Sequence, residues 1–335
     1  GEAVSGEVDE YYLSLSQTIS TGGKKDARRQ LGASGQALVY AEFEQLRHEI
    51  VIEILRAQRD YKASLARVEL AQRRSDLMRK FFETAQLRHA AGDMGKSEVY
   101  LARVALATAL DQVAEANSNL SSAESTLLVA SQQRDPSVWP DVEETPEHLV
   151  IPEDVRRIPA VNLAHLNTAV ASANASLADA FRKPDPNFEL RAGREADENL
   201  IGVTFSVPLF VRNNFSNEHL AALDAENAAS IRANALELET GIQLEVLKKA
   251  YDTALANWES WQDLISGEFD AALELNNRLW ESGEISTSDY LLQLDRLLES
   301  NEAGINLRFR VQQIWVDWLD VSATWQQWFT EGELL

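Results

Sequence analysis

Histidine is the side chain that most often binds metals or moves protons in proteins, and this chain holds five histidines. They stand far apart, and none belongs to the Glu-x-x-His pair of a di-iron helix bundle or to a His-Glu-x-x-His zinc motif. The sequence also lacks a nucleophile elbow, a glycine-rich phosphate loop and any cysteine. We therefore expect no enzyme, no cofactor and no bound metal, and we expect the histidines to lie on the surface or to pack between helices: His48, His89, His148, His165 and His219.

Acidic residues outnumber basic residues by 53 to 31, which gives a net charge of −22 and a pI of about 4.6. Such a charge repels nucleic acid and anionic membrane surfaces, so we expect no nucleic-acid partner. The same charge attracts cations.

Two glycine turns share one spaced motif and are the main candidate functional sites. Gly92-x-Met94-x-x-Ser97-Glu98 returns 191 residues later as Gly283-x-Ile285-x-x-Ser288-Asp289. The glycines permit a tight turn, and we expect the serines to cap the helices that follow. Acidic residues gather at both turns, and on their own they suit the first turn of a helix: Asp93, Glu98, Glu284 and Asp289.

Helical periodicity covers most of the chain and must position these turns. It predicts a long helix over 24–91, a tip turn over 92–97 and a return helix over 98–131. A proline-rich connector follows over 134–159. A second series then comprises helix 160–181, long helix 214–281, tip turn 282–288 and return helix 289–329, which carries Trp315, Trp318, Trp325 and Trp328 on one face. A helix of about 65 residues is roughly 100 Å long and needs lateral partners, as in a coiled coil.

Three short segments alternate between apolar and polar residues and are predicted strands: 11–19, 187–193 and 200–210. One face of them carries the apolar side chains. The other carries serine, threonine and proline in the first and third segments, and Asn187, Glu189 and Arg191 in the second. An isolated strand cannot satisfy its own backbone, so these strands must pair within the chain or between copies of it. The apolar face consists of Leu13, Leu15, Val203, Phe205, Val207 and Leu209.

The chain is an internal duplication. The strand segments 13–19 and 203–209 match at an offset of 190, and the two turns match at an offset of 191. Residues 1–133 therefore form a first repeat and residues 160–335 a second, each built as strand, very long helix, tight turn and returning helix.

This arrangement resembles the TolC-like outer-membrane factors, and two stretches resemble the heavy-metal (CzcC-like, cobalt–zinc–cadmium) branch: LSQTISTGGKKDAR and RKPDPNFELRAGREADENLIGVTFSVPLFVRNN. The resemblance implies a trimer in which long helices form an α-helical barrel in the periplasm and strands form a β-barrel in the outer membrane. It implies the passive exit duct of a tripartite efflux pump for divalent heavy-metal cations, which works with a periplasmic adaptor protein and an inner-membrane RND transporter. The family also leads us to expect a further helix and strand before Gly1.

The resemblance assigns roles to the motifs. The turn residues would dock the adaptor: Gly92, Met94, Ser97, Gly283, Ile285 and Ser288. The acidic residues of the turns, repeated in a trimer, would form rings that concentrate cations at a gate. The apolar strand face would contact outer-membrane lipid, and Asn187, Glu189 and Arg191 would line the lumen.

A soluble coiled-coil scaffold or adhesion protein without channel activity is the alternative, with the alternating segments as hairpins. Such a hairpin would expose its apolar face to water and aggregate. A metalloenzyme is a more distant alternative that stoichiometric, tightly bound metal would support.

Overall fold

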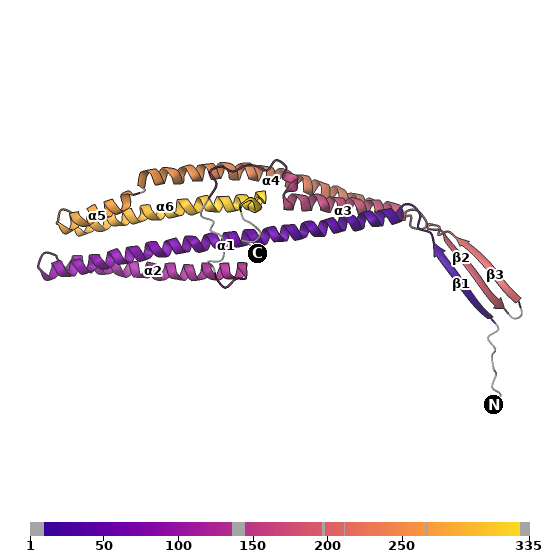
Figure 1. Cartoon of the computed structure of the whole chain (residues 1–335), viewed down its shortest axis with the longest axis horizontal. Helices are drawn as coiled ribbons and strands as arrows, with labels where there is room; N and C mark the ends of the chain where they lie inside the picture. The colour runs from indigo at the N-terminus through magenta and orange to yellow at the C-terminus, as the bar shows by residue number, and fades with distance from the viewer. Residues whose placement is uncertain (1–9, 136–144, 196–197, 211, 266, 329–335) are drawn as a thin grey trace, which may run out of the picture. The chain divides into compact units, whose positions relative to one another are not determined.

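The computed structural model describes residues 10–135, 145–195, 198–210, 212–265 and 267–328, which are mostly helical with one small sheet (Figure 1). The chain divides into two compact units: Gly1–Gln45 with Arg156–Glu239, and Leu46–Val155 with Thr240–Leu335. Two helices, α1 (Lys24–Ala90) and α4 (Ser216–Ile265), have residues in both units. Among the described helices, none combines the length and the apolar character that a membrane crossing requires.

The sheet of the first unit contains β1 (Glu10–Thr18), β2 (Asn187–Glu195) and β3 (Glu198–Ser206). The strands are antiparallel in the order β1-β2-β3, and Leu15, Leu190 and Val203 share one row of the register. Side chains of alternate residues point to opposite faces, so this row continues into an apolar face whose large residues are between 44% and 80% exposed: Leu13, Leu15, Phe188, Leu190, Ile201, Val203 and Phe205.

β3 ends at Ser206, four residues before the predicted end at 210. Its last register partner is Asn187, the first residue of β2, and Pro208 has no N–H with which to extend the ladder. Val207 and Leu209 are exposed but lie beyond the strand, so their expected place on the apolar sheet face is wrong.

An ion pair between a buried lysine and a partly exposed aspartate joins the sheet to the helices of the first unit. The ammonium of Lys24, only 3% exposed, lies 2.8 Å from Oδ1 of Asp185 and donates to the Lys183 carbonyl at 2.7 Å. Oδ1 of Asp185 also accepts the Thr21 N–H at 2.8 Å. These bonds connect the segment between β1 and α1 with the segment between α3 (Pro159–Phe181) and β2.

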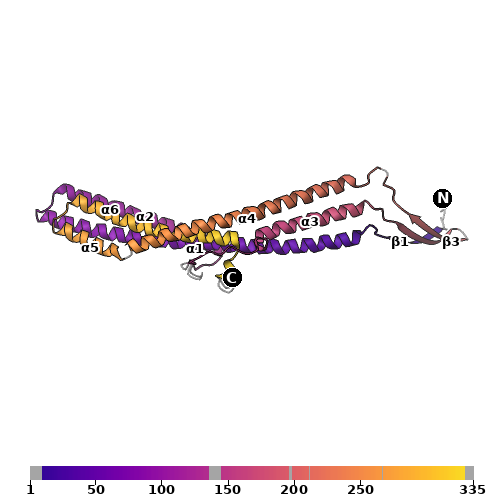
Figure 2. The same ribbon diagram turned by 90° about the horizontal axis from the view of Figure 1, so that it is seen from above.

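The second unit contains two helical hairpins together with the last part of α4. In one, α1 turns into α2 (Lys96–Ser131); in the other, α5 (Glu268–Glu281) turns into α6 (Thr287–Ser322). Both views show the two turns at the same end of this unit (Figures 1 and 2). A core cluster connects the hairpins near the turns, with Phe81 and Ala102 from the first and Trp280 and Leu294 from the second.

The predicted long helix 214–281 is not continuous. It is divided into α4, which ends at Ile265, and α5, which begins at Glu268, while Ser266 lies outside the described residues. Gly267 has a φ of 88°, which is incompatible with α-helix and which glycine adopts without a steric penalty. The start is also later than predicted, because Asn213 and Asn214 accept hydrogen bonds from the N–H groups of Phe215 and Ser216 and hold a turn there.

The last helix is also shorter than predicted. α6 ends at Ser322, followed by Ala323 with a φ of 52°, rather than at 329, a residue outside the described part. Trp325 therefore belongs to the short helix η3 (Trp325–Gln327), and the ring of Trp328 packs edge-on against Trp315 at 5.7 Å. The four tryptophans do not share one face of a single helix.

The connector predicted over 134–159 is irregular where it is described. Residues 145–154 form no regular element, and η2 (Val155–Arg157) precedes α3. The hydroxyl of Tyr251 donates to the carbonyl of Pro146 and anchors the segment to α4. Pro136 and Pro140 lie outside the described residues.

Replacing Asp185 with Asn should destabilise the protein by about 3 kcal/mol, because the buried Lys24 ammonium loses its counter-charge. The exposed pair of Asp26 and Arg29, 3.5 Å apart, provides a matched control: Asp26→Asn should cost less than about 1 kcal/mol.

The stability should also depend on pH. The hydrogen bond from Lys24, followed by that from the Thr21 N–H, lowers the pKa of Asp185. The contribution of Asp185 to the free energy of unfolding is therefore complete above about pH 4, the pKa of an unfolded aspartate. It is lost as the pH falls through the lowered pKa that Asp185 has in the folded protein. Denaturant unfolding at pH 7 and pH 3 measures both effects; equal losses for the two variants at pH 7 would contradict the prediction.

Candidate functional site

The two glycine turns close their helices with the same backbone hydrogen bonds. At the first turn, the N–H of Gly92 donates to the carbonyl of His89, and the N–H of Asp93 donates to the carbonyl of Arg88. At the second, Gly283 donates to Trp280 and Glu284 to Leu279. This is the Schellman pattern, which requires a left-handed residue, and the two glycines have φ values of 87° and 81°.

The helices after the turns begin earlier than predicted. The residue that precedes α2 is Gly95, and the residue that caps α6 is Ser286, so Ser97 and Ser288 lie inside the helices and are not the caps. Ser286 Oγ accepts the Asp289 N–H at 3.1 Å. At the equivalent position of the first turn, Gly95 has no side chain, and Glu98 Oε2 instead accepts the Gly95 N–H at 2.9 Å. Both carboxylates also suit the positive end of the helix dipole.

An aromatic cluster packs beneath the turns. The rings of Phe81, Trp280 and Tyr290 have centroids 4.8–5.0 Å apart. Burial, together with the nearby Glu281 carboxylate, raises the pKa of the Tyr290 hydroxyl to about 12. The hydroxyl therefore stays protonated at neutral pH and donates to Asn277 Oδ1 at 2.7 Å.

A chain of hydrogen bonds, here called the inter-turn network, connects the two turns. Trp280 Nε1–H donates to Thr287 Oγ1 at 3.3 Å, and the Thr287 hydroxyl donates to Glu98 Oε1 at 3.0 Å. Since Glu98 Oε2 accepts the Gly95 N–H, both oxygens of this carboxylate are used inside the protein. Thr287 is buried, so this contact is shielded from water.

Arg88 makes a second connection between the turns. Its Nη1 donates to the carbonyl of Trp280 at 2.9 Å, and its guanidinium lies 5.4 Å from the centroid of the Trp280 ring. An arginine in the last turn of α1 therefore donates to a carbonyl at the end of α5. Separation of the turns would break this contact together with the inter-turn network.

The structure gives the predicted docking residues different environments. Met94 is buried in the core cluster and Ile285 packs partly against it, so these two anchor the turns from inside. Gly92, Ser97, Gly283 and Ser288 are exposed and available to a partner. The acidic candidates also differ in exposure. Glu98 is half-buried and bonded to the other turn, whereas three carboxylates are exposed to solvent: Asp93, Glu284 and Asp289.

Of the residues that join the turns, Glu98 was a candidate from the sequence, whereas Arg88, Trp280 and Thr287 were not expected. Trp280 and Thr287 occupy the positions of His89 and Lys96 in the first repeat, so the duplication itself offers no matching signal. The one available signal was the motif offset, which places Glu98 and Asp289 in equivalent positions. It does not indicate that Glu98, and not Asp289, accepts a hydrogen bond from the other turn.

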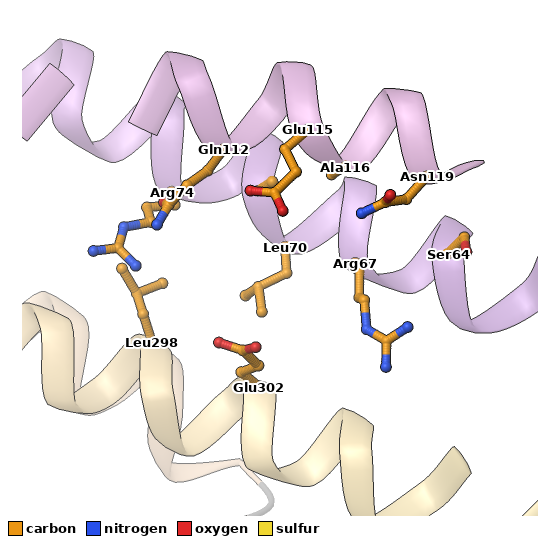
Figure 3. Close-up of a pocket in the computed structure, with 11 residues that line it drawn as sticks. Ser64, Arg67, Leu70, Arg74, Gln112, Glu115, Ala116, Asn119, Leu298 and Glu302 are labelled. Atoms are coloured by element: carbon orange, nitrogen blue, oxygen red, sulfur yellow. The ribbon is translucent and has the colours of Figure 1, made fainter. Parts of the chain in front are cut away.

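A cavity of about 250 Å³ lies farther along the second unit, between α1, α2 and α6. Figure 3 shows the carboxylates of Glu115 and Glu302 on opposite sides of Leu70. Arg74, which also lines the cavity, pairs with Asp295 at 2.6 Å. The lining thus mixes both signs of charge, and no group of three or more potential metal ligands occurs anywhere in the described residues.

Four of the five histidines lie in helices, and His148 is exposed in the irregular segment 145–154. His89 Nδ1 lies 2.8 Å from the Met94 carbonyl, and because a carbonyl only accepts, this nitrogen carries the proton. His48 is buried on α1, with Nε2 2.8 Å from the carbonyl of Asp320. His165 bonds to Glu237 and His219 to the carbonyl of Ala175.

No protein-family model matches the sequence, and no curated protein does either. Solved structures match over nearly the whole chain. The outer membrane protein VceC of Vibrio cholerae is 17% identical, with 92% of this chain and 78% of VceC covered and a TM-score of 0.75. The CmeC outer membrane channel of Campylobacter jejuni is 14% identical, with coverage of 93% and 70% and a TM-score of 0.77.

The open state of the MtrE outer membrane channel of Neisseria gonorrhoeae is likewise 14% identical, with coverage of 96% and 77% and a TM-score of 0.77. At these identities the likeness establishes the fold. It confirms the predicted fold class, which is TolC-like and mainly helical with a small sheet.

Replacing Thr287 with Val should loosen the paired turns, because the buried Trp280 N–H and one Glu98 oxygen lose their partner. An unsatisfied buried group costs about 1–3 kcal/mol, so amide hydrogen exchange in both turns should accelerate by roughly tenfold or more. Thr287→Ser keeps the hydroxyl and should exchange like the wild type, as should the exposed Ser288→Ala. Equal exchange in Thr287→Val and Thr287→Ser would show that the inter-turn network does not hold the turns together.

Proposed function

We propose that this chain forms the exit duct of a tripartite efflux pump in the bacterial outer membrane, as a trimer whose helical part stands in the periplasm. The observation that carries the proposal is the three-stranded sheet with one exposed apolar face, in a chain that shares its fold with outer membrane channels.

The sheet is better suited to lipid than to water. Leu13, Leu15, Ile201 and Val203 are each at least 74% exposed. They occupy two adjacent rows of the register, in which Ala192 and Leu190 of β2 lie between the β1 and β3 members. A contiguous apolar surface of this kind on a soluble monomer would drive aggregation. The opposite face carries hydroxyls, an amide, the Glu198 carboxylate and one ion pair, which suit contact with water, and its larger apolar members are Tyr12 and Leu200.

The trimer is supported by unpartnered apolar stripes on the long helices of the first unit. Val39 and Phe43 on α1 are 62% and 61% exposed, and Ile231 and Leu238 on α4 are 69% and 67% exposed. Spacings of four and seven residues keep each pair on one face of its helix, as at a coiled-coil interface. We propose that these stripes pack against other copies of the chain around a threefold axis.

The paired turns serve as gate and docking site in this proposal. The exposed Gly92, Ser97, Gly283 and Ser288 contact the periplasmic adaptor, while Met94 and Ile285 hold the turn backbones in place from the core. Docking that separates the turns opens the duct, and the inter-turn network resists this separation. The duct is passive and uses no cofactor, because an inner-membrane RND transporter supplies the energy.

We propose divalent heavy-metal cations as the cargo. The chain has a net charge of −22, and Asp93, Glu284 and Asp289 expose carboxylates at the turns. Threefold repetition of these carboxylates concentrates cations near the gate. Glu98 contributes its charge but is held by the inter-turn network, so we assign it to gating rather than to contact with cations.

A lysine on the apolar sheet face should prevent membrane insertion, whereas a lysine on the neighbouring polar position should not. Val203→Lys places a charge in lipid at a cost of about 2–4 kcal/mol. Thr204→Lys, the matched control, faces Glu189 in the register. Reconstitution of the full chain into liposomes, followed by flotation, should recover the wild type and Thr204→Lys with lipid but little Val203→Lys. Equal recovery of both variants, or a wild type that stays soluble without detergent, would favour the scaffold alternative.

A further inference from the structure

We propose that the ion pair of Glu189 and Arg191 sets the charge selectivity of the duct at the level of the strands. Glu189 neutralises the guanidinium of Arg191 and keeps the wall from attracting anions. The inference rests on the proposed function, because it requires the polar face of the sheet to line a water-filled lumen.

The pair is formed within β2. Arg191 Nη2 lies 3.1 Å from Glu189 Oε1, and the guanidinium lies 5.9 Å from the ring centroid of Tyr12 on β1. The two residues are separated by one position, so they share the polar face of the sheet. Both contacts draw the guanidinium down along the sheet surface.

The neighbouring positions leave space for this arrangement. Ser14 and Gly202 flank Arg191 in the register, and Ser16 and Thr204 flank Glu189. Gly193 pairs with Tyr12, and a Cβ atom at position 193 would overlap the Tyr12 ring and the Tyr11 carbonyl oxygen. The absence of a side chain at position 193 therefore lets Tyr12 lie beside Arg191.

Arg191 is the one basic residue among the strand positions that share the polar face within β1, β2 and β3. The positive charge of Arg191 therefore differs in sign from the net charge of the chain, which is strongly acidic. A lone guanidinium, repeated in each copy, would form a positive ring in the path of departing cations. With Glu189 at hydrogen-bond distance, each pair carries no net charge, and its field falls off steeply beyond the wall.

Permeability ratios in planar bilayers test the role of the pair. The full chain is measured in a potassium chloride gradient near 10 mM, where the Debye length is about 30 Å. Relative to the wild type, Glu189→Gln should lower the cation-to-anion permeability ratio by about twofold and Arg191→Gln should raise it by about twofold. The double variant, and the exchanged pair Glu189→Arg with Arg191→Glu, should return the ratio to the wild-type value.

Arg194→Gln is the matched control, because position 194 lies on the opposite face of the same strand and its change should leave the ratio unaltered. An unchanged ratio in both single variants, with normal conductance, would overturn the role of the ion pair and leave the proposed duct intact. An Arg194→Gln shift as large as that of Arg191→Gln would overturn it as well. No conductance from any form, including one opened by Thr287→Val, would overturn the inference together with the proposed function.

Discussion

Helices as long as these depend on lateral packing. α1 has 67 residues, and α2 and α6 have 36 each, yet the intrinsic tendency of a sequence to form helix contributes little stability without an apolar interface. Near the turns, this interface is the cluster around Phe81, Trp280 and Leu294. In the first unit, Phe43 and Ile231 instead present apolar side chains to solvent. The need of long helices for an apolar interface thus explains the hairpins within one chain, and it is the reason for the proposed contacts between chains.

The duplicated turns illustrate how two copies of one motif can acquire complementary roles. Both keep the glycine and the acidic residue three positions into the next helix. In the second copy Ser286 supplies the cap, and in the first the Glu98 side chain does so while also accepting the Thr287 hydroxyl. The divergence at Gly95 and Thr287 therefore converts two similar turns into one connected structure. A gate proposed at this place has a specific bond that docking must break.

The amount that could be predicted from the sequence varied with the kind of signal. Period-two alternation located the strands, and helical periodicity located the long helices, because both patterns extend over many residues. The effect of single residues that interrupt a pattern was not predicted: Pro208 ends β3 early, and Gly267 divides the predicted helix 214–281. The turn motif located the candidate site but placed the caps at Ser97 and Ser288. The inter-turn network could not be predicted, because Thr287 and Glu98 are 189 residues apart in sequence and meet only through helix packing.

Single-channel recording tests the central claim most directly. The purified full chain should insert into planar bilayers and show small, infrequent conductance steps, because the closed turns restrict the path. Thr287→Val should increase the conductance or the open probability, while Thr287→Ser should behave as the wild type. A protein that inserts but shows no conductance in any of these forms would contradict the account of this chain as a duct gated at its paired turns.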